Sequence, residues 1–194
     1  MADSTNYDYM SNGNDTANVR VIKQYALFLF KSSDSSVTLP TSKDWTPPVD
    51  AKPVGYSTED GAVLHPEPGD ETEIKGHNGD VIYSEASGGY WTLQLAGVEC
   101  KKDIASAYFG VDAATDGSLK LDSAATAGEY NVVLAALDQH GDPLVVVLHN
   151  ASVSDRDDVT LTYTDAVQLN LTFKGKKPAG GHMLEIYGLV KDAA

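Results

Sequence analysis

The segment from residue 166 to 174 alternates apolar and polar side chains without interruption, and this pattern restricts the possible folds more than any other feature. Val167, Leu169, Leu171 and Phe173 fall on one side, and Gln168, Asn170 and Thr172 fall on the other. Successive side chains of a β-strand point to opposite faces, so the pattern predicts a strand with one buried and one wet face. Residues 90–99 predict a second such strand, with Trp91, Leu93 and Leu95 opposite Thr92, Gln94 and Ala96. Two strands of this kind favour an antiparallel sheet that covers a core with one face.

Turn-forming residues separate several further apolar segments. The run at 21–30 mixes aromatic and aliphatic residues and predicts a strand that is buried on both faces for part of its length. Two hairpins are expected from glycine-containing turns, one at Glu59–Gly61 and one at Ser87–Gly89. The remaining strands are predicted at 54–58, 62–64, 80–86, 130–137, 144–148 and 183–190, with a short one at 119–121.

A single helix is predicted at residues 101–109. Ile104 with Tyr108 and Ala105 with Phe109 form apolar pairs four residues apart, and Gly110 follows as a helix terminator. Many short strands with one helix predict a mainly β fold. We expect an antiparallel β-sandwich or barrel with one short flanking α-helix at 101–109 and long loops.

A chain of 194 residues favours a single domain. Residues 1–18 are polar and aperiodic and predict a flexible N-terminal arm, which leaves 19–194 as the domain. A long loop at 32–53 contains four prolines and Trp45. Trp45, with its neighbours Asp44, Pro47 and Pro48, either folds back onto its own domain or docks on a partner subunit, and we weigh the two equally.

The formal net charge of −14 argues against a tight nucleic-acid binder, because such proteins need clustered Lys and Arg. No apolar run approaches the roughly 20 residues of a membrane-spanning helix. The amino-terminal sequence lacks the basic and apolar regions of a signal peptide. With Cys100 as the one cysteine, these features predict folding in a reducing cytosol and no membrane insertion.

No enzyme signature is present. The five histidines are scattered, and no nucleophile elbow, phosphate-binding loop or dinucleotide fingerprint occurs. Asp138, His140 and Asp142 could bind a metal from one turn, but they are also ordinary turn residues, which we favour. For the acidic cluster at 155–158 we favour a salt-bridged, solvated turn over a calcium site. The sequence therefore predicts a protein that is not an enzyme and needs no metal or other cofactor.

An ordered series of motifs resembles the major tail tube proteins of long, non-contractile-tailed bacteriophages (siphophages) of Gram-positive hosts. Gly55, Tyr56, Glu59, Asp60 and Gly61 fall in a segment similar to the family's "LGYxSEDG" motif. Ile74 and Lys75 follow at the spacing of its "I-K" motif, and the residues after them, 76–78, lack the usual tryptophan. Further similarities lie at 79–81, 91–95, 101–110 and 148–172.

The resemblance implies an antiparallel β-sandwich whose copies form hexameric rings that stack into a tube. In such a virion the tube is assembled in the host cytoplasm, and viral DNA passes through it without specific binding. Implied partners are further copies of the chain, the tape-measure protein, the tail terminator and the distal tail proteins. Since the chain ends at Ala194, no C-terminal immunoglobulin-like domain is expected.

A tube of this kind needs a sheet face that is wet, unobstructed and free of cations. We expect Thr92, Gln94, Gln168, Asn170 and Thr172 to form this lumen face, with acidic residues at the rims: Asp70, Glu71, Glu73 and Asp80. For either strand alone, the solvent face of an ordinary sandwich is the slightly favoured alternative. The Trp45 loop is expected to contact the next ring. Alternatives are a carbohydrate-binding or adhesion β-sandwich with Trp45, Tyr90 and Trp91 as stacking platforms, a β-sandwich hydrolase, or another phage tail or head-completion structural protein.

Overall fold

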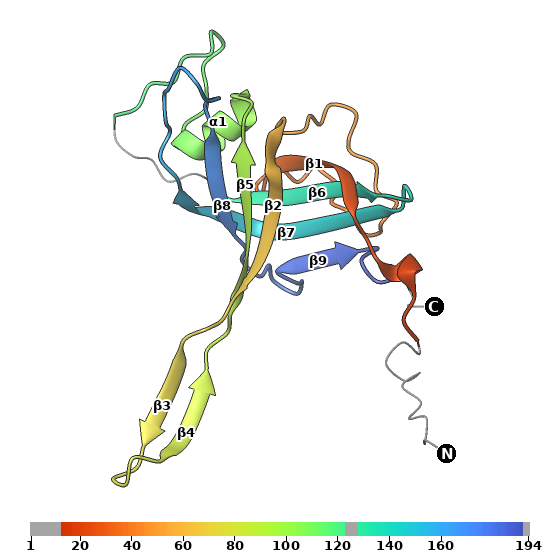
Figure 1. Cartoon of the computed structure of the whole chain (residues 1–194). Coiled ribbons are helices and arrows are strands. Elements are labelled where there is room, and N and C mark those ends of the chain that lie inside the picture. Colours follow the sequence, from red (N-terminus) through yellow and green to blue (C-terminus); the bar gives the residue numbers. More distant parts are fainter. Residues whose placement is uncertain (1–12, 123–127, 192–194) are drawn as a thin grey trace.

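The protein is described by a computed structural model that covers residues 13–122 and 128–191. The elements are a 3-10 turn at Thr16–Asn18, β1 (Ile22–Lys31), β2 (Ser57–Glu67), β3 (Glu71–Lys75), β4 (Val81–Ala86), β5 (Tyr90–Gly97), α1 (Lys102–Phe109), β6 (Tyr130–Asp138), β7 (Pro143–Arg156), β8 (Leu169–Lys174) and β9 (Leu184–Tyr187). Seven strands form one antiparallel sheet in the order β1-β6-β7-β8-β5-β2, with β9 added to β7. The sheet curls so that β2, β5 and β8 cross β1, β6 and β7 (Figure 1). The predicted mainly β, antiparallel class with one short helix is confirmed.

The curl depends on β7, which belongs to both halves of the sheet. Its first part pairs with β6 and β9, and the stretch from Ser152 to Arg156 pairs with β8. Between the two parts, Asn150 adopts a positive φ of 46°, and the pairing with β6 shifts register. The backbone N–H of Asn150 donates to the side-chain oxygen of Asn131, which satisfies this irregular point. A bulge of this kind bends a strand and increases its twist.

The core lies inside the curl and is closed by α1. Ile104 and Ala107 of the helix are fully buried against the sheet. A Cβ on Gly97 would lie 2.3 Å from Cδ1 of Ile104, so a larger residue would force the Ile104 side chain to shift where the helix approaches the strand. Gly110 ends the helix in the left-handed conformation, as predicted. The largest fully buried side chains are Phe173, Leu27, Leu93, Leu95, Ile104, Leu148 and Leu171.

Both hairpins predicted around β2 and β5 were wrong. Glu59–Gly61 is not a turn, because β2 continues through it and only its register with β5 shifts there. Ser87–Gly89 does not join a hairpin either: β4 pairs with β3, whereas β5 pairs with β2 and β8. The actual turn lies at residues 76–80, where the N–H of Gly76 donates to the carbonyl of Asp80. The result is a β3–β4 hairpin that extends away from the body (Figure 1).

Predictions from local sequence at the other strands were more accurate. The turn at 138–142 between the strands predicted at 130–137 and 144–148 is confirmed, as are the strands that became β1, β8 and β9 within a few residues. Leu27 and Phe28 are both buried although they are consecutive, which confirms that part of β1 is covered on both faces. The short strand predicted at 119–121 is not formed. In the described ranges, no helix is long and apolar enough to cross a bilayer.

Candidate assembly surfaces

One face of β5 and β8 is polar, and we call it the polar face. Cross-strand partners in an antiparallel ladder point to the same side, and here they are Thr92 with Lys174, Gln94 with Thr172, and Ala96 with Asn170. The structure thus brings together four of the five residues predicted for the lumen. The fifth, Gln168, lies one residue before β8 begins. Gln94 is exposed, Asn170 and Thr172 are half-buried, and Thr92 is buried.

Hydrogen bonds tie the polar face to the neighbouring strands. The hydroxyl of Thr92 donates to the carbonyl of His65 on β2, and that of Ser154 on β7 donates to the carbonyl of Thr172. The Asn170 amide donates to the carboxylate of Asp157 at 3.1 Å. These contacts position the side chains of Thr92 and Asn170 and link β5 and β8 to β2 and β7.

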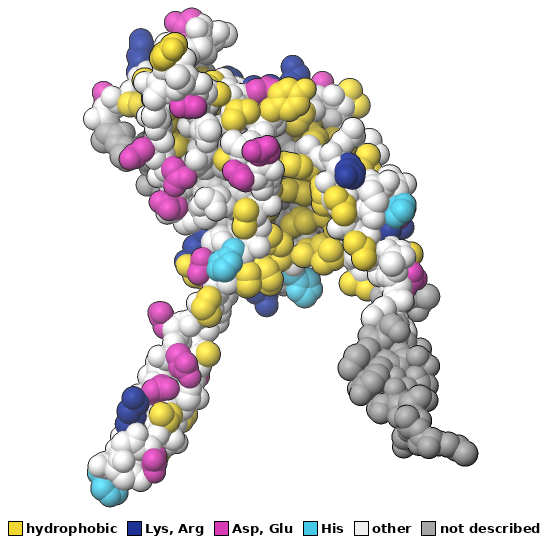
Figure 2. Space-filling view, in the orientation of Figure 1, with side chains coloured by type: hydrophobic (Ala, Val, Ile, Leu, Met, Phe, Trp, Pro, Cys, Tyr) yellow, Lys and Arg dark blue, Asp and Glu magenta, His cyan; other side chains and the backbone are white. Residues whose placement is uncertain are grey.

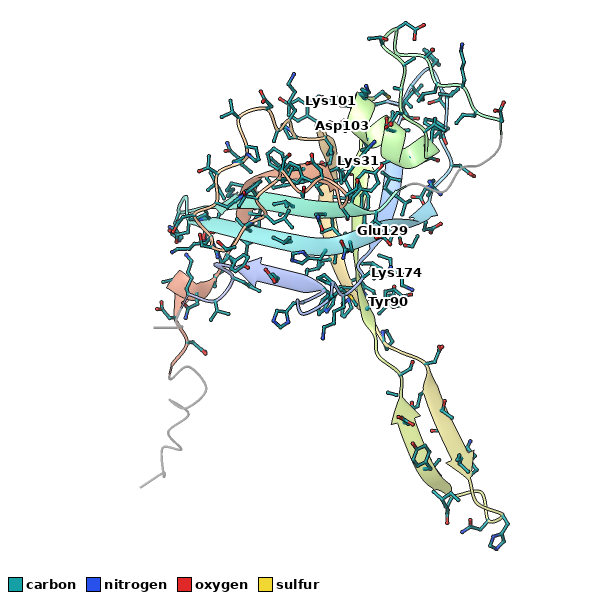
Figure 3. All side chains as sticks on the ribbon, turned by 180° about the vertical axis from the view of Figure 1, so that it is seen from behind. Lys31, Tyr90, Lys101, Asp103, Glu129 and Lys174 are labelled. Carbon is teal, nitrogen blue, oxygen red and sulfur yellow. The ribbon has the colours of Figure 1, made fainter. Side chains whose placement is uncertain are left out.

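The cation of the polar face lies on an aromatic ring. Lys174 Nζ lies 3.6 Å from the centre of the Tyr90 ring, near the point where β5 begins (Figure 3). An ammonium group over a ring face is attracted by the electron-rich π system. Between Thr92 and Ala96, and between Asn170 and Lys174, no other residue carries a charge. The face is therefore almost neutral in a chain of net charge −14.

The end of the polar face near α1 is bordered by the acidic cluster at 155–158. The Tyr108 hydroxyl donates to the carbonyl of Asp157. Partial burial and the nearby Asp158 charge raise the pKa of Tyr108. In the described ranges no carboxylate lies within ion-pairing distance of Arg156, whose Nε and Nη2 are buried without a hydrogen-bond partner. The salt bridge that we expected within residues 155–158 is therefore not formed.

Trp45 packs on its own subunit. Its ring meets Phe28 edge-on at 5.6 Å between centroids and Phe30 at 6.5 Å. Its indole N–H donates to the carbonyl of Thr38 at 3.3 Å. Of the two alternatives left open by the sequence, the structure shows the fold-back onto the domain. Of the flanking residues, Asp44 is exposed, and Pro47 and Pro48 are half-buried.

The family-motif residues divide between two places. Gly55 has φ +118° and lies so close to Glu99 that a Cβ would come within 2.7 Å of that side chain. Glu99 in turn accepts from Tyr56 N–H and pairs with Lys101 at 2.8 Å. The Lys101 hydrogen bond lowers the pKa of Glu99 although burial opposes this. Gly55 and Tyr56 therefore fix the entry into β2, and Glu59, Asp60 and Gly61 form its irregular start.

Ile74 and Lys75 lie instead on the β3–β4 hairpin, which the sequence did not predict. Each of its strand residues is exposed, and four of them are large and apolar: Ile74, Val81, Ile82 and Tyr83. The acidic residues predicted for the lumen rim, Asp70, Glu71, Glu73 and Asp80, lie on or beside this hairpin. The strand at 80–86 was predicted, but Ile74 is the one apolar residue of 71–75, so no alternation indicated β3.

An apolar groove of about 940 Å³ opens between β1, β6 and β7 on one side and β2 on the other. Its apolar lining includes Leu64, Leu93, Leu134, Val146, Ile186 and Leu189. Figure 2 shows hydrophobic side chains gathered between the base of the β3–β4 hairpin and the start of β1. Ile22 and Leu189 at its margin are 42% and 52% exposed. The groove is thus a part of the core that residues 13–122 and 128–191 leave uncovered.

A cluster that we call the terminal clasp also escaped prediction. The buried carboxylate of Asp138 accepts the backbone N–H groups of His140 and Asp142, each at 2.9 Å. Arg20 and Lys191, from the two ends of the described chain, contact it at 3.0 and 3.1 Å. Burial opposes ionisation, but these hydrogen bonds outweigh it and hold the pKa of Asp138 far below its usual value. Asp138 therefore orders a turn and anchors both chain ends, and no group of three potential ligands in the described residues is placed to hold a metal.

Comparison with known proteins completes the assignment. Residues 31–187 match the family described as "Phage tail tube protein". The chain belongs to this family. It is therefore a structural protein of the phage tail and not an enzyme, as predicted. No curated protein shows a significant match to it.

Solved structures of injection-system components match this phage tail tube protein weakly. The anti-feeding prophage baseplate matches at 14% identity, over 87% of this chain and 95% of that chain, with a TM-score of 0.43. The sheath–tube complex of an extracellular contractile injection system matches at 9% identity over 94% and 98%, with a TM-score of 0.39. The anti-feeding prophage tube-terminating cap matches at 12% identity over 89% and 95%, with a TM-score of 0.41. Similarity of this degree does not indicate shared assembly details.

Proposed function

We propose that six copies of this chain form a ring, and that rings stack into the tail tube of a siphophage through which viral DNA reaches the host. The observation that carries the proposal is the almost neutral polar face of β5 and β8, backed by buried Leu93, Leu95, Leu171 and Phe173. A tube wall needs this combination, because one side must be core and the other must be wet and smooth.

The charge on the polar face suits the passage of a polyanion. Binding of DNA through Lys and Arg releases counterions and gives salt-dependent affinity, which would slow a moving strand. Gln94 and Thr172 offer hydrogen-bonding groups without charge. Lys174 is held on the Tyr90 ring, which reduces its availability to phosphates. DNA would therefore pass a wall that does not bind it strongly and that stays hydrated.

Subunits join in this proposal through the free edge of β2. This strand of 11 residues is at the end of the sheet order, and within the described part of the chain it pairs on one side only. An unpaired strand edge is a template for pairing with another chain. Adding the sheet of the next subunit along β2 would continue the wall around the ring. Contacts of the Trp45 loop, through Asp44, Pro47 and Pro48, would then help to join one ring to the next.

The other proposed partners are proteins that a tail tube needs in order to assemble. A tape-measure protein would occupy the lumen during assembly in the host cytoplasm, and tail terminator and distal tail proteins would close the two ends. The aromatic platforms of the alternative carbohydrate-binding function do not form a row, because Trp91 packs against the core, Trp45 packs on Phe28 and Tyr90 lies under Lys174.

The test is to place cations on the polar face of assembled virions. Gln94→Lys and Thr172→Lys change two directly opposed residues, and Thr172 is preferable to Asn170 because Asn170 bonds Asp157. Electron microscopy should show intact tubes, and DNA ejection should slow or stop. Ala114→Lys with Thr115→Lys, on an exposed loop after α1 that has no role in the proposed contacts, is the matched control and should eject normally. Normal ejection from the Gln94/Thr172 variant would show that this face does not line the lumen.

A further inference from the structure

We infer that Asn78, in the turn of the β3–β4 hairpin, is a site of spontaneous deamidation. The reaction converts the side-chain amide into a carboxylate and needs no reactant other than water. The inference goes beyond the proposed function and does not depend on it, because it concerns the chemistry of one turn in the single chain.

The residue that follows Asn78 distinguishes it from the other asparagines that the structure describes. Deamidation closes a five-membered ring between the side-chain Cγ and the backbone nitrogen of the next residue, and a side chain on that residue hinders the closure. Asn78 precedes Gly79, and both residues are exposed to water. The other described asparagines precede residues that carry a side chain: Asn14, Asn18, Asn131, Asn150 and Asn170.

Hydrogen bonds turn the Asn78 side chain toward the nitrogen that must attack it. Its Nδ2 donates to the carboxylate of Asp80, and its Oδ1 accepts the backbone N–H of Asp80 at 3.4 Å. Contacts of an Asn side chain with the backbone two residues further on are common in turns. Because Nδ2 and Oδ1 are both bonded to Cγ, that carbon faces the residues that follow. The backbone nitrogen of Gly79 is therefore a close neighbour of the carbon that it attacks.

One contact in the turn opposes the reaction. The N–H of Gly79 donates to the carbonyl of Gly76 at 3.0 Å, so the nitrogen must leave this hydrogen bond before it attacks. In the described ranges, β3 and β4 form a two-stranded sheet apart from the main sheet. An isolated hairpin is marginally stable, and its local opening costs much less than unfolding of the core. We therefore expect the reaction to proceed through opening of the turn while the body stays folded.

The reaction is an intramolecular acyl substitution followed by hydrolysis. The backbone nitrogen of Gly79 loses its proton to solvent base and forms a bond to Cγ of Asn78. The Cγ–Nδ2 bond then breaks, and the amide nitrogen takes a proton from water and leaves as ammonia. Water opens the resulting succinimide at either carbonyl, so position 78 becomes aspartate or isoaspartate. One water is consumed and one ammonia is released, and nothing is oxidised or reduced.

Deamidation changes both the charge and the hydrogen bonding of the hairpin. Residues 71–86 carry four carboxylates and one lysine, and the new carboxylate is the fifth. It has no N–H to donate to Asp80, and it repels that carboxylate within the turn. Isoaspartate also adds a carbon to the backbone close to the Lys75–Val81 pair, where the ladder already shifts register. The hairpin should therefore loosen, whereas the core should not change, because every strand residue of the hairpin is exposed.

Peptide mapping of the full-length, unassembled protein tests the inference. Samples are held at 37 °C at pH 7 and at pH 9, and mass spectrometry of the digests measures aspartate and isoaspartate at each asparagine. Position 78 should convert faster than exposed Asn18, which precedes a valine. Conversion should be faster at pH 9, because the attacking nitrogen must lose its proton. Asn12 also precedes a glycine but lies outside the described residues, so it is measured separately.

A substitution of the glycine tests the mechanism without removing the asparagine. Gly79→Asn introduces a residue type that tolerates the φ of +86°, and a Cβ at this position meets nothing within 4 Å. The new side chain should hinder ring closure and abolish most of the conversion at Asn78. Gly117→Asn is the matched control, because Gly117 has a φ of +82° and equally open surroundings. This control should leave the conversion at Asn78 unchanged.

The outcomes decide between deamidation at this turn and ordinary slow ageing of the chain. Conversion at Asn78 that is no faster than at Asn18, or that is unchanged in Gly79→Asn, would overturn the inference. Hydrogen exchange of the converted protein should be faster in β3 and β4 and unchanged in β6 and β7. Equal exchange of the hairpin before and after conversion would refute the expected loosening.

Discussion

Trp45 gives the sharpest test of how a residue can serve both folding and assembly. Its ring makes two edge-on contacts, with Phe28 and Phe30, at centroid distances within the favourable range. Each such pair contributes about 0.5–1.5 kcal/mol beyond the burial of area. We therefore expect Trp45→Ala to lower the free energy of unfolding by about 2 kcal/mol. For a domain of this size that corresponds to a fall in Tm of roughly 4–8 °C.

Urea unfolding of the unassembled protein measures this loss directly. Trp45→Phe keeps an aromatic ring on Phe28, so its loss of unfolding free energy should be less than half that of Trp45→Ala. Val49→Ala changes a fully exposed residue of the same loop and should leave stability unchanged. If Trp45 also contacts the next ring, tube formation by Trp45→Ala should fall further than the loss of stability explains. A variant with unchanged unfolding but failed assembly would show that the contacts with Phe28 and Phe30 contribute nothing in solution.

Two further predictions concern the terminal clasp and the helix contact. Because the pKa of Asp138 is lowered on folding, its contribution to stability is present above the ordinary carboxyl range and is lost as pH falls towards the folded pKa. Asp138→Asn should lower the unfolding midpoint at pH 7, and thermal melts should show the difference shrinking below about pH 4. Gly97→Ala places a methyl group against Ile104 and should lower the free energy of unfolding by about 1–3 kcal/mol. Adding Ile104→Val, which removes the clashing methyl group, should restore part of this loss in a double-mutant cycle.

The elements that were predicted correctly are those whose structure depends on neighbouring residues in the sequence. The β6–β7 hairpin follows from two apolar runs around a short polar turn, and α1 follows from apolar spacing and Gly110. The pairing of β4 was mispredicted because alternation identifies a strand but not its partner. Ser87–Gly89 has the composition of a tight turn, yet here it connects the end of one hairpin to a strand of the main sheet.

The candidate surfaces were predictable to a similar degree. Alternation alone indicated that Gln94 and Thr172 lie on polar faces, but only the register shows that they are neighbours. The clasp joins Arg20, Asp138 and Lys191, which are far apart in the sequence, so no local pattern could reveal it. The fold-back of Trp45 was one of two options, because composition does not distinguish docking within a chain from docking between chains.

The core of this protein also determines its polar face. Leu93, Leu95, Leu171 and Phe173 are each at most 2% exposed, and the residues between them point the opposite way. A shift of either strand by one residue would place leucine on the wet face and polar groups in the core. Packing therefore fixes the register, and the register fixes which residues line the proposed conduit. Changes to Gln94 and Thr172 should alter DNA passage while the protein still folds, whereas changes to the buried side chains should destroy both.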